Sequence, residues 1–409
     1  MKTIYLDNNA TTRVAPEVYE AMIPYLTEDY FNPSSMYEPA RLTGQAIAAA
    51  RKRVAVRLGG VDPKEILFTG CATESNNTAI VGTAHGNPNR KHIITTTVEH
   101  PAVLEVCREL ERDGYKVTYL SVDREGRLDV REFIRALSPS TLLVSIMHAN
   151  NETGVIFPID QLSRITKQTD PSIIFHSDAT QTVGKLPIDL VQGFPYVDLL
   201  SFSGHKLHAP KGIGVLFIRR GTRCRPFMLG GHQEDGRRAG TENFPYIVGI
   251  AKALDLAMEH REQDEAKIEK LRDRLEVTLV NKIPSVQVNG KDAPRLPNTL
   301  NISFHYIEGE GMLFQLSAYG ICASSGSACT SGSLEPSHVL RAMKVPFTAI
   351  HGSVRFSLSR YNTDEDVDTI IDVFPQIVAN LRNLSPYWDN ERNAPRPDAL
   401  NLIQQTHSG

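Results

Sequence analysis

The sequence predicts an α/β protein that has a large domain built on a mainly parallel sheet and a smaller α+β domain. Between about residues 60 and 220, apolar β-rich runs alternate with helical patterns. These runs are apolar throughout rather than at every second residue, which is typical of strands in a sheet covered on both faces. After about residue 250 the pattern changes to a long amphipathic helix followed by further strands.

The predicted elements of the large domain follow one another along the chain. In order they are EILFTG, a helix-like ATESNNTAIVGTA, HIITTTVEH, a helical PAVLEVCRELERDG, KVTYLSV, TLLVSIMHANNETG, another helix, SIIFHSDAT, VDLLSFSGHK and GIGVLFIRR. A chain of 409 residues is long enough for two domains. We therefore expect the large domain to span residues 15–254.

The smaller domain is predicted from a change of pattern. Apolar residues at spacings of three and four indicate an amphipathic helix, and Thr363 begins another whose first turn is acidic. The strand-like NTLNISF and SVRFSLS flank a helical EGEGMLFQLSAYG. The apolar positions of the two helices are Ile268, Leu271, Leu275 and Leu279, then Val367, Ile370, Ile371 and Phe374. We expect residues 1–14 and 255–384 to form this domain, and the polar residues 385–409 to lie over the surface as a tail.

Composition excludes several classes of partner. The net charge of −3 provides no basic footprint for nucleic acid. No run is apolar enough for a membrane span, and the amino terminus does not resemble a signal or transit peptide. The five cysteines include no CxxC pair, which argues against a disulfide scaffold or a zinc site and favours the cytoplasm.

Polar residues gather just after the predicted strands. In an open parallel sheet, ligands bind at the carboxyl ends of the strands, so these residues should meet at one edge. A polar residue at such a position is often only a turn or helix cap, and a lone histidine is more often structural than catalytic. Convergence from five strand ends favours a site. The residues are Cys71, Ala72 and Thr73; Glu99 and His100; His148, Asn150 and Asn151; Asp178 and Gln181; and Ser203, His205 and Lys206.

The chemistry of these groups matches a pyridoxal phosphate site. The Thr73 hydroxyl and free helix N–H groups suit a phosphate, Asp178 could hold a pyridinium N–H, and Lys206 could form a Schiff base. The segment SFSGHK also has a simpler interpretation, a strand that ends in a basic turn and continues as a hairpin through LHAPKG. Gly204, which lets backbone approach a ligand closely, favours the functional interpretation.

Several long motifs, in the right order, give the chain its resemblance to a known family. They are YLDNNATTRV, FTGCATESN, TTVEHPAVL, MHANNETG, HSDATQTVGK, SFSGHKLHAPKGIGVL, GGHQEDGRRAGTEN and ASSGSACTSGSLEPSHVLRAM. To about residue 390 the chain resembles the cysteine desulfurases of the class V aminotransferase family, most closely those of the nitrogen-fixation (NifS) type. The resemblance implies the type I aminotransferase-like fold of pyridoxal phosphate-dependent transferases, with a seven-stranded sheet in the large domain.

The resemblance also implies roles for individual residues. Lys206 would hold the cofactor, Asp178 would pair with its ring nitrogen, and His100 would stack on the ring and move protons. Arg355 would clamp the substrate carboxylate, a task that suits its bidentate fork. The remaining cofactor contacts would come from Ala72, Thr73, Ser203, Gly204, His205, Asn151 and Gln181, with Thr241 entering from a partner subunit. A homodimer with composite sites follows.

The implied reaction converts L-cysteine to L-alanine and leaves a persulfide on Cys329. Lys206 and His100 would move the Cα proton, and the Cys329 thiolate would attack the substrate sulfur. Only about 3% of an ordinary thiol is ionised at pH 7, so a proton acceptor or an electropositive approach must raise the thiolate fraction, and His100 is the candidate, acting through the substrate. The acceptor of the persulfide sulfur would be a NifU-like iron–sulfur scaffold serving nitrogenase. Cys329 could contact the iron of this scaffold transiently as a metal ligand. A housekeeping desulfurase, a selenocysteine lyase or an aminotransferase would share most of these residues.

The segment ASSGSACTSGS discriminates among these enzymes. Its composition alone is typical of a linker. An aminotransferase or lyase does not need Cys329 on such a segment, whereas a thiol that enters a pocket and then meets another protein does. A sulfur carrier without enzymatic activity would lack the cofactor altogether.

The match to the family has departures. Phe31 stands in FNPSS where relatives usually have glycine, and Tyr37 and Pro39 replace residues of a usual histidine–FG segment. Asp235 replaces a usual arginine, and Asn76 stands where aspartate is frequent. None of these departures removes a proposed catalytic group.

Overall fold

The structure is a computed structural model that describes residues 2–325, 336–397 and 399. Its centre is a seven-stranded sheet of order β2-β8-β7-β6-β5-β3-β4. Strand β8 is antiparallel to both of its neighbours, and the other neighbouring pairs are parallel, which confirms the mainly parallel sheet. The strands are β2 (Ile66–Thr69), β3 (His92–Thr96), β4 (Lys116–Leu120), β5 (Thr141–Ser145), β6 (Ile174–Asp178), β7 (Leu199–Ser203) and β8 (Gly214–Ile218).

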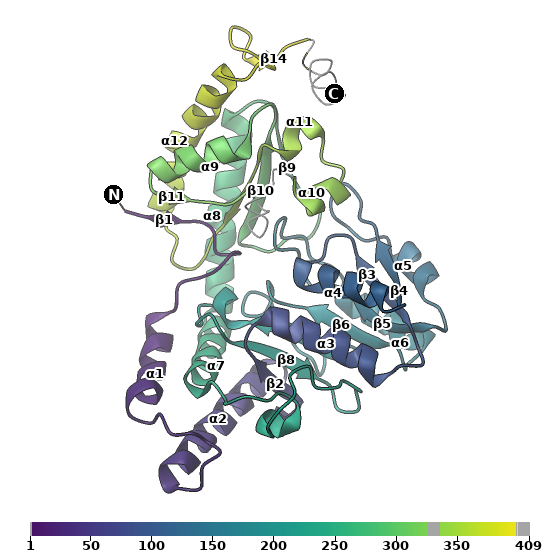
Figure 1. Cartoon of the computed structure of the whole chain (residues 1–409). Helices are drawn as coiled ribbons and strands as arrows, with labels where there is room; N and C mark the ends of the chain where they lie inside the picture. Colours follow the sequence, from purple (N-terminus) through teal and green to yellow (C-terminus); the bar gives the residue numbers. More distant parts are fainter. Residues whose placement is uncertain (1, 326–335, 398, 400–409) are drawn as a thin grey trace.

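Helices cover both faces of this sheet, as the apolar strands predicted (Figure 1). Successive residues of a strand point to opposite faces, so one strand contributes to two cores. Ile93 packs into a cluster with Val103 and Cys107 on one face, and Ile94 packs into a larger cluster on the other. The helical segments of this part are α1 (Pro16–Thr27), α2 (Glu38–Arg57), η1 (Pro63–Glu65), α3 (Ala72–Gly86), α4 (Pro101–Arg112), α5 (Val130–Ala136), α6 (Ile159–Thr169), η2 (Gly204–Lys206), η3 (Gln233–Gly236) and α7 (Phe244–Glu259).

A second region has its own sheet and hydrophobic cluster. Strands β12, β10 and β9 form an antiparallel sheet in that order, and helices α8, α9 and α12 pack around it (Figure 1). All eight apolar helix positions that the sequence predicted lie in this cluster. The elements after α7 are α8 (Arg261–Lys282), β9 (Val286–Val288), β10 (Thr299–Phe304), α9 (Gly309–Ala318), β11 (Ile321–Cys322), α10 (His338–Ala342), α11 (Phe347–Ile350), β12 (Ser353–Ser357) and α12 (Asp364–Asn383). Of these, α10 and α11 place their buried apolar residues in the large cluster of the first region.

Two short strand pairs lie near the two ends of the described part of the chain. Strand β1 (Ile4–Tyr5) pairs in parallel with β11. Residues 4 and 5 therefore lie beside a strand that is more than 300 positions further along the chain. Near the other end, β13 (Trp388–Asp389) pairs with β14 (Ala394–Pro395). Within this predicted surface tail, Trp388 is buried, with the Arg382 guanidinium 4.1 Å from its ring centroid.

The described helices include none that is both long and apolar enough to cross a membrane.

Candidate active site

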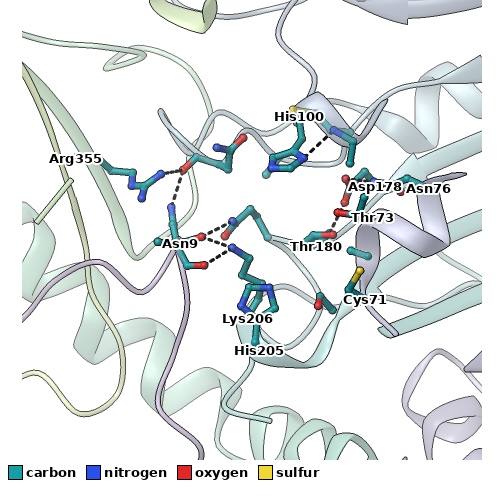
Figure 2. Close-up of a pocket in the computed structure, with 18 residues that line it drawn as sticks. Asn9, Cys71, Thr73, Asn76, His100, Asp178, Thr180, His205, Lys206 and Arg355 are labelled. Carbon is teal, nitrogen blue, oxygen red and sulfur yellow. Dashed lines mark hydrogen bonds between the residues drawn. The ribbon is translucent and has the colours of Figure 1, made fainter. Parts of the chain in front are cut away.

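A cavity of about 360 Å³ lies at the carboxyl ends of the central parallel strands (Figure 2). Strand β6 ends in Asp178, β7 continues into η2 and Lys206, β2 leads into α3, and the segment after β3 leads through His100 into α4. The sheet topology therefore gathers side chains from distant parts of the sequence. The lining residues are Asn9, Ala10, Cys71, Ala72, Thr73, Asn76, His100, Ala102, Met147, Ala149, Asn151, Asp178, Thr180, Gln181, Ser203, His205, Lys206 and Arg355.

The N-terminus of α3 supplies an anion site to one side of the cavity. Cys71 is the N-cap residue, and its side chain makes no cap hydrogen bond within the described structure. The N–H groups of the first turn of any helix lack partners inside the helix, so those of Ala72 and Thr73 can bind an anion. Both residues line the cavity. This end of the cavity suits a phosphate group.

Asp178 is held in place by two donors at the floor of the cavity. Asn76 Nδ2 donates to Asp178 Oδ2 over 2.7 Å, and the Thr180 N–H donates to Oδ1 over 2.9 Å. Asn76 is fully buried. It stands where relatives often have aspartate, and it contacts Asp178, a predicted cofactor residue, directly. These two hydrogen bonds fix the orientation of the Asp178 carboxyl group toward the cavity.

Lys206 lies across the cavity from Asp178 (Figure 2). Its Nζ donates to the backbone carbonyls of Asn9 and Ala10, over 2.6 and 2.7 Å. The strand and hairpin predicted for this segment are present, whereas the Schiff-base role of Lys206 stays a prediction. Strands β7 and β8 are an antiparallel pair, as the hairpin requires, and the Lys206 amine nevertheless reaches the cavity.

Two histidines of the cavity are kept neutral by their surroundings. Burial lowers the pKa of His100, and this effect outweighs the nearby Asp178 carboxylate. His100 Nδ1 accepts the Ala102 N–H over 3.1 Å, which leaves the proton of the neutral ring on Nε2. Burial, with help from Lys206 and Lys211, lowers the pKa of His205 to about 4. Neutral imidazoles here can donate a hydrogen bond without adding charge.

Arg355 closes the far side of the cavity. It is 2% exposed, its Nη1 donates to the Asn151 carbonyl over 3.0 Å, and its Nη2 pairs with Asp7 over 2.6 Å. Its buried Nε has no partner within the described structure. A buried donor of this kind is costly unless a ligand satisfies it. The guanidinium is thus fixed in orientation and retains capacity to bind an anion.

The structure brings together most of the predicted site residues, although their roles stay predictions. Gly204 does not line the cavity, because the space beside its Cα is occupied: a Cβ there would lie 2.7 Å from Ile213 Cγ2. Thr241 lines a separate cavity beside Glu234 and Arg238. Cys329 lies outside the described residues.

Sequence reasoning missed part of the site. Asn9 and Ala10 hold the amine of Lys206, and Thr180 holds Asp178, yet neither pattern nor spacing pointed to them. The only available signal for Asn9 was its place in the motif YLDNNATTRV. The other lining residues missed are apolar and small or flexible: Ala102, Met147 and Ala149.

The comparisons with known proteins agree with this geometry. Residues 4–370 match the family described as Aminotransferase class-V. A cysteine desulfurase of Trichormus azollae is 56% identical over 391 residues, 96% of each chain, and the cysteine desulfurase NifS of Azotobacter vinelandii is 52% identical over 97% of this chain and 98% of its own. A solved NifS-like protein superimposes with a TM-score of 0.87 at 41% identity, covering 93% of this chain and all of its own.

The fold and the site define a pyridoxal phosphate-dependent enzyme of the aminotransferase type. The chain belongs to the class V aminotransferase family and, within it, to the cysteine desulfurases.

The residues present fit the cofactor of this family. An uncapped helix N-terminus, a carboxylate and a lysine amine surround one cavity and match the phosphate, ring nitrogen and aldehyde of pyridoxal phosphate. Two buried oxygens at the same place, Asn76 Oδ1 and Thr180 Oγ1, have no partner among the described residues. Unsatisfied buried polar atoms in a cavity are typical of a ligand site.

Proposed function

We propose that this cysteine desulfurase acts through a persulfide on Cys329. L-cysteine and the Cys329 thiol would give L-alanine and Cys329–S–SH, so that the sulfur atom moves and every hydrogen is accounted for. The observation that carries the proposal is the single cavity in which Lys206 and Asp178 face each other between the α3 N-terminus and Arg355. A thiol nucleophile on ASSGSACTSGS completes the set.

Four residues of the cavity have proposed tasks in this reaction. Pyridoxal phosphate supplies an electron sink for the carbanion at the substrate Cα. Asp178 keeps the ring nitrogen protonated, and Arg355 holds the substrate carboxylate. Lys206 accepts the proton from Cα, and His100, with its proton on Nε2, donates to the departing sulfur or orients it.

The dimer and the compartment are part of the proposal. Thr241 lines a cavity different from that of its own chain's Lys206, which supports its donation to a partner subunit's phosphate site. The four described cysteines are free thiols, which supports a reducing, cytoplasmic setting. The 52% identity to NifS supports an iron–sulfur scaffold of the NifU kind as the sulfur acceptor, with nitrogenase as the destination.

The test is to incubate the purified enzyme with ³⁴S-labelled L-cysteine and to map the labelled peptide by mass spectrometry while alanine is quantified. We expect label on Cys329 and alanine formation without any keto acid. The Cys329→Ala variant should lose persulfide and most alanine formation. Cys71→Ala, which removes the thiol that lines the cavity, is the matched control and should keep the Cys329 label.

Other results would contradict the proposal. Label on a different cysteine, or a normal rate in Cys329→Ala, would reject the persulfide step. A requirement for a keto acid would indicate an aminotransferase, and turnover of selenocysteine but not cysteine would indicate a lyase.

A further inference from the structure

Lys185 is a second lysine beside the site, and the reaction proposed above does not use it. It lies half-buried next to the cavity, and with Lys206 it lines a smaller adjoining cavity. Its Nζ donates to Gln181 Oε1 over 3.0 Å and lies 3.5 Å from Asn9 Oδ1. Among the described residues, its hydrogen-bond partners are amide oxygens and no carboxylate pairs with it.

The contact from Lys185 and the contact to the Asn9 carbonyl together fix which way the Gln181 amide faces. The two ends of a glutamine amide have nearly the same shape, so hydrogen bonds decide its orientation. Because the charged form of the Lys185 amine only donates, it binds the Oε1 end of the amide and leaves Nε2 on the other side. Nε2 then donates to the Asn9 carbonyl over 3.0 Å, the same oxygen that accepts from Lys206 Nζ. Gln181 therefore presents an N–H group on the side where the lysine amine lies.

Asn9 is contacted by the same donor. Its Oδ1 accepts from Asn298 over 3.0 Å and faces Lys185, so its Nδ2 is free to donate to the Asn151 carbonyl over 3.1 Å. The Asn151 carbonyl also accepts from Arg355. Lys185 thus contacts the oxygen ends of two buried amides, Gln181 and Asn9, whose nitrogen ends lie toward the Asn9 and Asn151 carbonyls.

We propose that Lys185 is a positioning residue that holds the Gln181 amide with its N–H toward the phenolic oxygen of the bound cofactor ring. The proposal rests on the function proposed above. An N–H at that place stabilises the anionic oxygen, whereas a reversed amide would direct its carbonyl oxygen there and repel it.

The charge environment supports a role that is not merely structural. Burial, followed by the nearby Lys206 and Arg355, lowers the pKa of Lys185 to about 7. Burying a lysine near two other cations without a paired acid lowers the stability of the folded protein. A residue that served only to stabilise the fold would not carry this cost. The other charged groups that face it or line the adjoining cavity are His208, Arg261, Asp264, Glu265 and Arg360.

A double-mutant cycle tests the proposal on purified apo-enzyme titrated with pyridoxal phosphate. Lys185→Met should weaken cofactor binding by about tenfold, the loss of one well-placed hydrogen bond. It should also raise the pH at which the absorbance of the bound cofactor changes, because the anionic oxygen loses its donor. In the Gln181→Met background, the same substitution should add little to either effect, because the two residues act in series.

Controls separate this role from the alternatives. Lys167→Met removes a lysine that is 16% exposed, pairs with Asp198 away from the cavity and should change thermal stability alone. Equal effects of Lys185→Met in both backgrounds would show that its charge acts directly on the cofactor and would overturn the proposal. Unchanged binding and absorbance in the single variant would also overturn it. Failure of the unmodified enzyme to bind pyridoxal phosphate or to form alanine would instead reject the proposed function.

Discussion

At the scale of single residues, burial removes the charge from histidines around the site. Burial lowers the pKa of His148, His176, His205 and His208 to about 4 each. At neutral pH these rings are therefore uncharged, and the potential in the cavity is determined by lysines, arginine and carboxylate groups. The neutral rings lower the free energy of unfolding only as the pH falls, because the unfolded chain then binds protons that the folded protein does not.

His148 provides a direct test of this cost. It is 5% exposed, and its Nδ1 lies 3.1 Å from Thr182 Oγ1. Its pKa is about 4 in the folded protein and 6.5 in the unfolded chain, so between these values the unfolded chain binds more protons and stability rises with pH. His148→Gln should remove about 2 kcal/mol of the stability difference between pH 5 and pH 7, measured by urea unfolding.

The control is His85→Gln, since the His85 side chain is exposed. That variant should keep the pH dependence of the unmodified protein. If His148→Gln also keeps it, the ring is protonated in the folded state and the assigned cause is wrong.

For single residues, the sequence predicted cavity positions correctly where a residue directly follows a predicted strand. Asp178 and Lys206 come at the ends of buried strands, so their place in the cavity could be predicted from the strand pattern. Asn9 and Lys185 could not be found that way. Asn9 hydrogen-bonds to Asn151 and Thr299, 142 and 290 positions away, and no local pattern encodes such contacts.

At the scale of elements, helix starts are encoded more clearly than short strands. The acidic first turn after Thr363 predicted the start of α12, and the structure places Thr363 at its N-cap. Cys322 follows the helical segment EGEGMLFQLSAYG closely, yet it lies in the short strand β11. That strand is two residues long and is defined by its pairing with β1, so its partner lies beyond any sequence window.

The α12 start is stabilised by a capping box that can be tested. Thr363 Oγ1 accepts the Asp366 N–H over 3.3 Å, and Asp366 Oδ2 accepts the Thr363 N–H over 3.2 Å. Thr363→Ala should lower the free energy of unfolding by about 1 kcal/mol in urea titrations. Thr369→Ala on the same helix is the matched control: it removes only an exposed hydroxyl bonded to the Glu365 carbonyl and should be neutral or slightly stabilising. Equal losses in the two variants would show that the cap contributes nothing.

At the scale of the whole molecule, the amino-terminal segment connects the two regions. Strand β1 joins the second region through β11, Asn9 lies in the cavity, and Val18 packs in the large cluster. The predicted boundary at residue 254 falls inside α7, whose Leu254 belongs to the large cluster. We propose two domains with the predicted ranges, the second of which has its own core.

Two buried phenylalanines can show whether these cores unfold separately. Phe374 lies in the cluster of the second region and Phe133 in the large cluster, and both are fully buried. Trp388 is the single tryptophan of the chain and contacts Arg382 of α12, so its fluorescence reports on the second region. The absorbance of bound pyridoxal phosphate reports on the strand ends of the large sheet. Phe→Leu substitutions in a core cost on the order of 1 kcal/mol.

Phe374→Leu should therefore lower the urea midpoint of Trp388 fluorescence more than that of cofactor absorbance, and Phe133→Leu should do the reverse. The reason is that a cavity destabilises first the cooperative unit that contains it. Excess cofactor should make the two midpoints approach each other, because a bound ligand stabilises both sides of the site. The two regions also share contacts around the cavity, such as that between Arg355 and Asn151. Midpoints that coincide in every variant, with and without cofactor, would show one cooperative unit and would contradict the division into two domains.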